Sequence, residues 1–339
     1  MTRCSIPMNV LRRTAALFAA TLLLPAALVA QKQTLLVLSK ADHTLAAVEP
    51  LTWKVLWKAP VGDDPHEVIA NTDGSLAWVS NYGSGSLHTL AVIDLIAHKA
   101  LPSVDLGNLH GPHGLDFVDG MLWFTAENPN VVASLDPGNN KVDTVLKTGQ
   151  QRTHMVWVSQ TGTVIVATNT GSGSVSIFEN QVSTDNPGHY DWIPHTVKVG
   201  EGAEGFDISP DRKEVWVANA KPGTISIVDL RAKQVLETIE AHVEGANRLQ
   251  FTPDGNFVLV TSLSQPDVTV LDAHTHKVVR RIPVGHGAAG LLIGPKGNHA
   301  FASCTPDNYV AVIDLHEWKV VAHIDAGGSP DGLAMAVVH

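Results

Sequence analysis

The feature that most constrains the fold of this 339-residue chain is an internal repeat of short, alternating segments. Four stretches end almost identically and a fifth more loosely: "LAVIDL" (90–95), "ISIVDL" (225–230), "VTVLDA" (268–273), "VAVIDL" (310–315) and "VASLDP" (132–137). Each follows another short run, such as "EVWVAN" (214–219), and turns rich in Gly, Asp and Pro separate the runs. Apolar residues at every second position predict strands, so one unit is predicted to be four short antiparallel strands.

The spacing of the units predicts how many there are. Aligned units begin at residues 66, 113, 154, 204, 247, 289 and 331, and the interval of 41 to 50 residues is typical of β-propeller blades. The last unit has room for only one strand, whereas residues 34–62 supply three without a first. We therefore predict an all-β, seven-bladed β-propeller, closed by a blade that the two termini share, which hides two sheet edges.

The repeat also resembles a known family. The pattern "W-V-A-N … I-x-I-V-D-L" with "P-D-G" turns resembles the YVTN-type β-propeller repeat over nearly all of residues 31–339. The resemblance implies the propeller fold but leaves the function open, because propellers serve as enzymes, electron-transfer partners and scaffolds.

Residues 1–30 have the pattern of a signal peptide. Arg3, Arg12 and Arg13 precede an uncharged apolar run at 15–30, which is too short and wrongly flanked for a membrane span. Cleavage after Ala30 would leave residues 31–339 as a single domain in the periplasm or outside the cell. That domain would retain one cysteine, so an internal disulfide is not expected.

Charge and hydropathy disfavour several classes of binding partner. The net charge of −10 disfavours binding to nucleic acid or anionic lipid. No later stretch is long and apolar enough for a membrane span, so we do not expect a membrane-embedded protein. The expected partners are a small ligand or a metal ion, or another periplasmic protein.

A column of polar residues marks the predicted channel mouth. The first strand of each blade lines the central channel, and its starting residues across the blades are His66, His113, His154, Glu204, Asn247, Ala289 and Asp331. Neighbouring inner strands lie about 10 Å apart or less, so these side chains are expected to converge. Further residues that could support the site are Asp63, His110, Glu201, His286 and Asp331.

Three imidazoles and one carboxylate suit a borderline-soft divalent metal better than Ca²⁺ or Mg²⁺. We therefore predict that His66, His113, His154 and Glu204 bind a divalent metal ion of open identity, or a small polar ligand. A polar ring that holds only water is the alternative, and it would leave a protein-interaction scaffold without metal.

One blade suggests an enzyme. "HGPHGLDFVDGMLWFTAEN" (110–128) resembles a blade of the streptogramin-lyase-like propellers, which are metal-assisted enzymes that open a cyclic ester. The resemblance implies that His113 and Glu127 are catalytic, with His66 as a partner, in a metal-dependent lyase or lactonase. Glu127 lies four residues after Trp123 rather than three, and one extra residue can turn a side chain to the other face. The direction of Glu127 therefore separates a binding protein from an enzyme.

Overall fold

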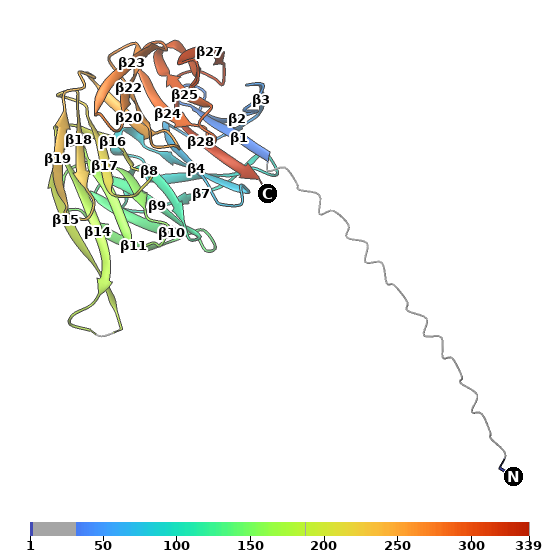
Figure 1. Ribbon diagram of the computed structural model, residues 1–339, viewed down its shortest axis with the longest axis vertical. Coiled ribbons are helices and arrows are strands. Elements are labelled where there is room, and N and C mark those ends of the chain that lie inside the picture. The colour runs from blue at the N-terminus through green and yellow to red at the C-terminus, as the bar shows by residue number, and fades with distance from the viewer. Residues whose placement is uncertain (3–31, 187, 339) are drawn as a thin grey trace. The chain divides into compact units, whose positions relative to one another are not determined.

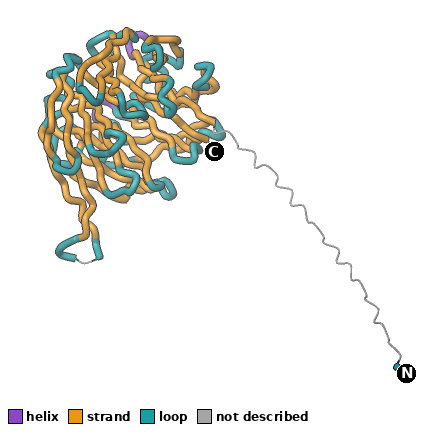
Figure 2. Tube along the Cα trace, viewed as in Figure 1, coloured by secondary structure: helices purple, strands orange, loops and turns teal. Residues whose placement is uncertain are grey.

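The computed structural model describes residues 1–2, 32–186 and 188–338. The chain divides into two units, residues 1–30 and Gln31–His339. The predicted signal peptide therefore falls almost entirely outside the described residues. In the second unit the described residues are nearly all strand and short loop (Figures 1 and 2), with two 3₁₀ turns, η1 (Gly83–Gly85) and η2 (Thr305–Asp307).

The strands of the described residues form seven four-stranded antiparallel sheets, one for each blade. Blades 1 to 3 consist of β4 (Pro65–Ala70), β5 (Leu76–Asn81), β6 (Thr89–Asp94) and β7 (Lys99–Asp105); β8 (His110–Val118), β9 (Met121–Asn128), β10 (Val131–Asp136) and β11 (Lys141–Lys147); and β12 (Thr153–Val158), β13 (Val164–Asn169), β14 (Ser174–Val182) and β15 (Tyr190–Lys198). Blades 4 to 6 consist of β16 (Ala203–Ile208), β17 (Glu214–Asn219), β18 (Thr224–Asp229) and β19 (Gln234–Ile239); β20 (Ala246–Phe251), β21 (Phe257–Ser262), β22 (Asp267–Asp272) and β23 (Lys277–Pro283); and β24 (Ala288–Ile293), β25 (His299–Cys304), β26 (Tyr309–Asp314) and β27 (Lys319–Ile324).

The seventh blade confirms the predicted closure of the ring. It is built from β28 (Pro330–Val338), β1 (Lys32–Ser39), β2 (Thr44–Val48) and β3 (Val55–Pro60), in that order. Strand β28 pairs antiparallel with β1, with Leu35 opposite Met335, and Figure 1 shows the two strands side by side. The two ends of the domain thus complete one sheet.

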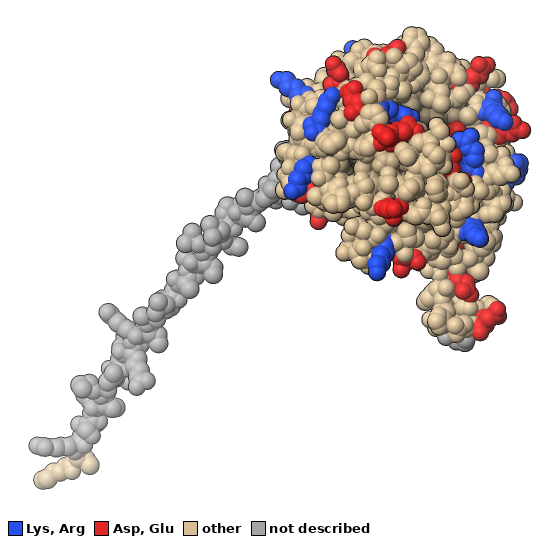
Figure 3. Space-filling view, turned by 180° about the vertical axis from the view of Figure 1, so that it is seen from behind, with Lys and Arg blue, Asp and Glu red and all other residues tan. Residues whose placement is uncertain are grey.

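The core lies between the blades. The second and third strands are buried along their length, as in β17 and β18, whereas the outermost strand β11 alternates between exposed and half-buried residues. This pattern follows from sheets that pack face to face, because inner strands are covered on both faces. Among the described residues, no helix is long and apolar enough to cross a membrane. Acidic and basic side chains are interspersed over the face drawn in Figure 3.

Candidate functional site at the channel mouth

The predicted polar residues occupy one structural position. His66, His154 and Glu204 are each the second residue of a first strand, in β4, β12 and β16. His113 is the fourth residue of β8, because that strand begins two residues earlier than the first strands of the other three blades. The repeat therefore places the four side chains at the same end of neighbouring blades.

Small side chains fix the backbone at this level. A Cβ on Gly114, directly after His113, would lie 2.7 Å from the carbonyl oxygen of His154, so only glycine allows the two strands to approach. The Thr125 hydroxyl donates a hydrogen bond to that same carbonyl at 2.5 Å. In the next blade, Thr168 donates to the carbonyl of Glu204 at 2.7 Å. The second strands of blades 2 and 3 thus each hold the site residue of the following blade.

The side chains of the four predicted residues converge. The rings of His66 and His113 are 5.1 Å apart, and those of His113 and His154 are 3.8 Å apart. The Nε2 of His154 lies 2.8 Å from Oε2 of Glu204. The predicted column is therefore a contiguous cluster, although its role stays a prediction.

Glu127 points into this cluster. Its side chain is buried, and its Oε1 accepts a hydrogen bond from Nδ1 of His154 at 2.7 Å. Its Oε2 accepts from the Tyr82 hydroxyl at 2.6 Å and from Nε of Arg152 at 3.3 Å. Its partner is therefore His154 of the next blade, not His113 of its own blade.

The hairpin of blade 2 explains this direction. Pro112 pairs with Ala126, as Pro65 pairs with Asn81 in blade 1, so the register is the same in both blades. In blade 2 the two strands continue pairing, and His110 lies opposite Asn128. No residue is therefore inserted before Glu127, which takes the place of Tyr82 in blade 1 and lies over the neighbouring blade.

The two carboxylates hold His154 as an imidazolium. Burial lowers the pKa of His154, but the charge of Glu204 and hydrogen bonds to both carboxylates outweigh it and raise that pKa to about 9. Burial opposes ionisation of Glu204, yet the His154 charge lowers the pKa of Glu204 to about 2. The pKa of Glu127 is lowered against the effect of burial, mainly by its hydrogen bond to His154.

His113 has the opposite character. Burial, together with the positive charge of His154, lowers its pKa well below the ordinary value, so the ring is neutral. Its Nδ1 is buried and has no hydrogen-bond partner in the described structure. A neutral imidazole with an unpartnered nitrogen thus lies beside a charged one.

A second column of residues completes the cluster. Lys40, Tyr82 and Glu127 each directly follow the second-strand residue that pairs with the residue before the column position, and each lies over the site histidine of the next blade. Lys40 donates to Nε2 of His66 at 2.9 Å, and the Tyr82 and His113 rings are 5.2 Å apart. Sequence reasoning missed Lys40 and Tyr82, although reading this position across the repeats would have found them.

Further ion pairs lie at the channel mouth beside the histidine cluster. Lys40 lies 3.1 Å from Oδ2 of Asp331, which was predicted as a supporting residue, and 3.5 Å from Oδ1 of Asp64. Across the mouth, partly buried Arg248 donates to the carboxylate of Glu67. Glu67 directly follows His66, and Arg248 directly follows Asn247. The sequence predicted no site residue at the position after the column.

The other predicted supporting residues lie in separate contacts on the rim. Their partners are His43 for Asp63, the Ser86 carbonyl for His110, Lys221 for Glu201 and Asp307 for His286. Asp63, Glu201 and His286 lie in the loops that enter the blades and His110 begins β8, and all four side chains contact neighbouring loops. The structure therefore does not bring these four into the cluster.

The cluster fits a metal ion poorly as it stands. Both ring nitrogens of His154 are hydrogen-bonded to carboxylates, and the ammonium group of Lys40 faces Nε2 of His66. Within the described part of the chain, no three His, Cys, Asp or Glu side chains are grouped as metal ligands would be. A metal site here would need these side chains to rearrange, so metal binding stays a prediction.

Seven radial blades around a polar channel mouth define a β-propeller. The chain belongs to the YNCE-like beta-propeller family, whose model matches residues 130–300. No curated protein matches the sequence.

Solved structures share the fold at low sequence identity. A functionally unknown protein from Desulfotomaculum acetoxidans superposes with a TM-score of 0.73 at 17% identity, over 89% of this chain and 98% of that one. A Bacteroides fragilis protein, provisionally named a 6-phosphogluconolactonase, gives 0.72 at 15% identity over 92% and 99%. Hydrazine synthase from Kuenenia stuttgartiensis gives 0.64 at 16% identity over 79% and 88%.

Proposed function

We propose that this chain is an exported propeller that binds a small polar ligand at its channel mouth. The observation that supports this most strongly is the unpartnered Nδ1 of buried, neutral His113. Leaving a buried polar atom unpaired costs about 1–3 kcal/mol, and native proteins rarely keep one without a reason. A ligand that hydrogen-bonds to His113 would remove that cost.

The surrounding charges favour a ligand with hydroxyl or carbonyl groups and an acidic group. Arg152 borders the mouth with its side chain 60% exposed, and Lys40 lies on the opposite side of Tyr82, next to His66. Both cations could contact an anionic group, while His113 contacts a neutral polar atom. A divalent metal ion is the second occupant that we propose for His66, His113, His154 and Glu204. It would have to displace the proton of His154, because metal-bound imidazole is neutral.

A ring-opening enzyme is the second candidate function. It is supported by Glu127, which lies buried in the cluster and hydrogen-bonds to His154. The His154 imidazolium would donate a proton to a leaving oxygen only after one of its two carboxylate partners moves away, because both ring N–H groups are bonded to carboxylates. Structural neighbours provisionally named as lactonases are in keeping with this candidate, although they share only the fold.

Native mass spectrometry of the purified, exported protein tests the proposal. His113→Ala is the test variant, and His286→Ala is a matched control because the His286 side chain is 77% exposed and contacts Asp307 instead. We expect a bound small molecule, or a metal ion, in wild type and His286→Ala and its loss from His113→Ala. The same spectra report whether the chain begins at Gln31, as the proposed export requires.

The other outcomes separate the alternatives. Equal occupancy in both variants, or none in wild type even after incubation with Zn²⁺ and with small hydroxy acids, would contradict the binding proposal. Opening of added lactones by wild type and His286→Ala but not by His113→Ala would replace the binding function with the enzymatic one.

A further inference from the structure

We call the interface between two neighbouring blades a seam. Each seam has one interior position that is equivalent around the ring. The residue at this position belongs to the second strand of its blade. Its pairing partner in the first strand lies three residues after the channel-mouth residue of that blade. Around the ring this position holds Trp78, Trp123, Val166, Trp216, Leu259, Phe301 and Leu36. Trp78 stacks on Phe117 of the next blade with ring centroids 5.4 Å apart, and Trp216 contacts Phe251 of the next blade edge to face at the same centroid distance.

Where the position is aliphatic, a neighbouring aromatic residue usually fills the seam. Trp157 pairs with Val166 and packs into the same cluster. Phe257 packs into the cluster of Leu259. These two seams are therefore filled without a large side chain at the equivalent position.

The seam between the terminal blade and blade 1 is different. Leu36 takes the equivalent position and pairs with Ala334, which is small. The aromatic residue of this seam, Trp57, belongs to β3, the outermost strand of the terminal blade, and stacks on His98 of blade 1 at 4.7 Å, with the rings 18° from parallel. Trp57 therefore forms a wall of the seam and leaves its interior open.

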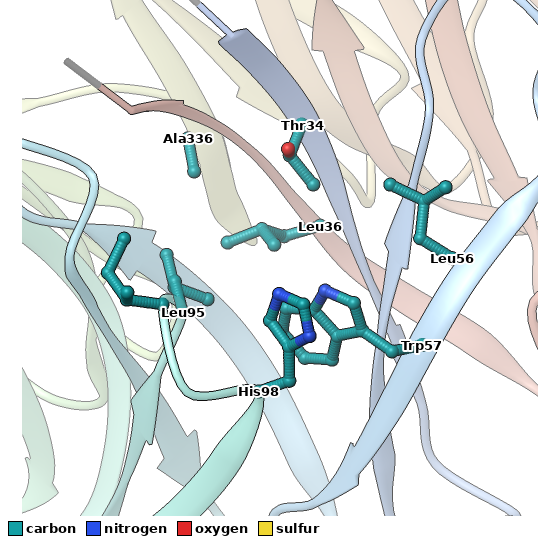
Figure 4. A pocket seen from close by; sticks show the side chains of 8 residues that line it. Thr34, Leu36, Leu56, Trp57, Leu95, His98 and Ala336 are labelled. Carbon is teal, nitrogen blue, oxygen red and sulfur yellow. The ribbon is translucent and has the colours of Figure 1, made fainter.

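A pocket of about 340 Å³ occupies this place. Figure 4 shows Leu36 facing the stacked Trp57 and His98, with Thr34 and Ala336 above them. Leu56 and Ile96 also line the pocket, and they are 46% and 59% exposed. No Lys, Arg, Asp or Glu is among the described residues that line it.

We propose that this pocket binds a small, planar, uncharged aromatic molecule, whose ring takes the place that tryptophan occupies in other seams. The volume lies at the lower end of the range for small-molecule sites, about 300–1,000 Å³, and the apolar lining with two polar side chains is typical of them. Trp57 offers an aromatic surface for stacking, and a bound ring would cover Leu56 and Ile96. The site is separate from the channel mouth and does not depend on the function proposed there.

Titration calorimetry with indole as the probe tests this site. We expect saturable one-to-one binding to wild type. Leu36→Trp fills the pocket and should abolish binding, whereas Ile96→Ser at the rim should weaken it roughly tenfold, the effect of about one lost apolar side-chain contact. Val182→Ser removes an equally exposed apolar residue on the β14–β15 hairpin and should leave binding unchanged.

Ile96→Ser keeps the test decisive if Leu36→Trp does not fold. Absence of saturable indole binding in wild type, or wild-type affinity in Ile96→Ser, would overturn the proposal. Binding of N-acetyltryptophan amide without binding of indole would also overturn it, because it would indicate an aromatic side chain of a partner protein as the occupant.

Discussion

His154 is the best-connected side chain of the channel mouth. Its ring lies between two carboxylates, at 2.7 Å from Glu127 and 2.8 Å from Glu204, and both bonds are largely shielded from water. Removal of one partner of such a shielded ion pair strongly destabilises the folded protein, because the remaining charge is left buried and uncompensated. The protonation state of His154 therefore links the cluster to pH.

This arrangement predicts a defined pH window of stability. The folded pKa of His154 is raised to about 9, so its contribution is complete below about pH 6.5 and is lost as the pH rises through 9. The folded pKa of Glu204 is lowered to about 2, so its contribution is complete above about pH 4.5 and is lost as the pH falls through 2. Urea unfolding should show a loss on the order of 2–3 kcal/mol between pH 6.5 and 9.5.

Substitution of His154 checks the cause of that loss. His154→Gln should remove most of the difference in unfolding free energy between pH 6.5 and 9.5. His286→Gln should retain it, because that side chain is largely exposed. An unchanged pH dependence in His154→Gln would show that other groups are responsible.

The sequence predicted the column residues but not the contacts across the seams. His66, His113 and His154 recur at one position of a repeat, and symmetry directs equivalent positions to one axis. The bond between Glu127 and His154 depends on how blade 2 packs against blade 3, which the pattern of a single strand does not show. The unpartnered nitrogen of His113 depends on burial from several blades, which no local pattern reports.

At the scale of the strand, a partly buried side chain in blade 2 links two first strands. Asp116 of β8 accepts hydrogen bonds from the backbone N–H of Phe117 at 2.8 Å and of Val158 in blade 3 at 2.7 Å. Asp207 and Gln250 make the same kind of bond to the following blade, to Phe251 and Ile293. These side chains fix the position of one first strand along the first strand of the next blade. Each lies three residues after the channel-mouth residue of its own strand.

Asp116→Asn is therefore expected to destabilise the protein. Burial raises the pKa of Asp116 to about 6, so at pH 7.5 the group is ionised and both oxygens accept. In asparagine one of them becomes an amide N–H₂ facing a backbone N–H, which leaves a buried donor unpaired. The unfolding free energy at pH 7.5 should fall by about 1–3 kcal/mol.

Asp119→Asn is the matched control for this substitution. Asp119 lies in the exposed turn of the same hairpin with φ at 51°, a conformation that asparagine tolerates well. The change in unfolding free energy caused by Asp119→Asn should stay within about 0.5 kcal/mol. Equal effects of the two substitutions would contradict the assigned role of Asp116.

At the scale of the whole molecule, the ring is held by one pairing between distant parts of the chain. The repeat spacing and the incomplete first and last units predicted this closure, because only their union makes a complete blade. The open seam beside that blade was not predicted. It follows from Leu36, Ala334 and the outward place of Trp57 together, and these residues lie on three different strands.

Removal of β28 should therefore affect the entire domain. Deleting residues 330–339 exposes the inner edge of β1 and removes the buried side chains of Leu333, Ala334 and Ala336 from the core. Loss of one buried leucine side chain alone costs about 2–5 kcal/mol, so the deletion should cost more than about 5 kcal/mol. Urea unfolding should show a markedly lower midpoint and a weaker cooperative transition.

A deletion elsewhere provides the control, because shortening the chain is not harmful in itself. Replacing residues 183–189 with Asn-Gly joins Val182 to Tyr190, which already pair, through a two-residue hairpin turn. That change lies at the tip of the hairpin that projects in Figures 1 and 2, and its effect should stay within about 0.5 kcal/mol. If the terminal deletion were as mild, blades 1 to 6 would be stable without closure, and the shared blade would serve only to cover an edge.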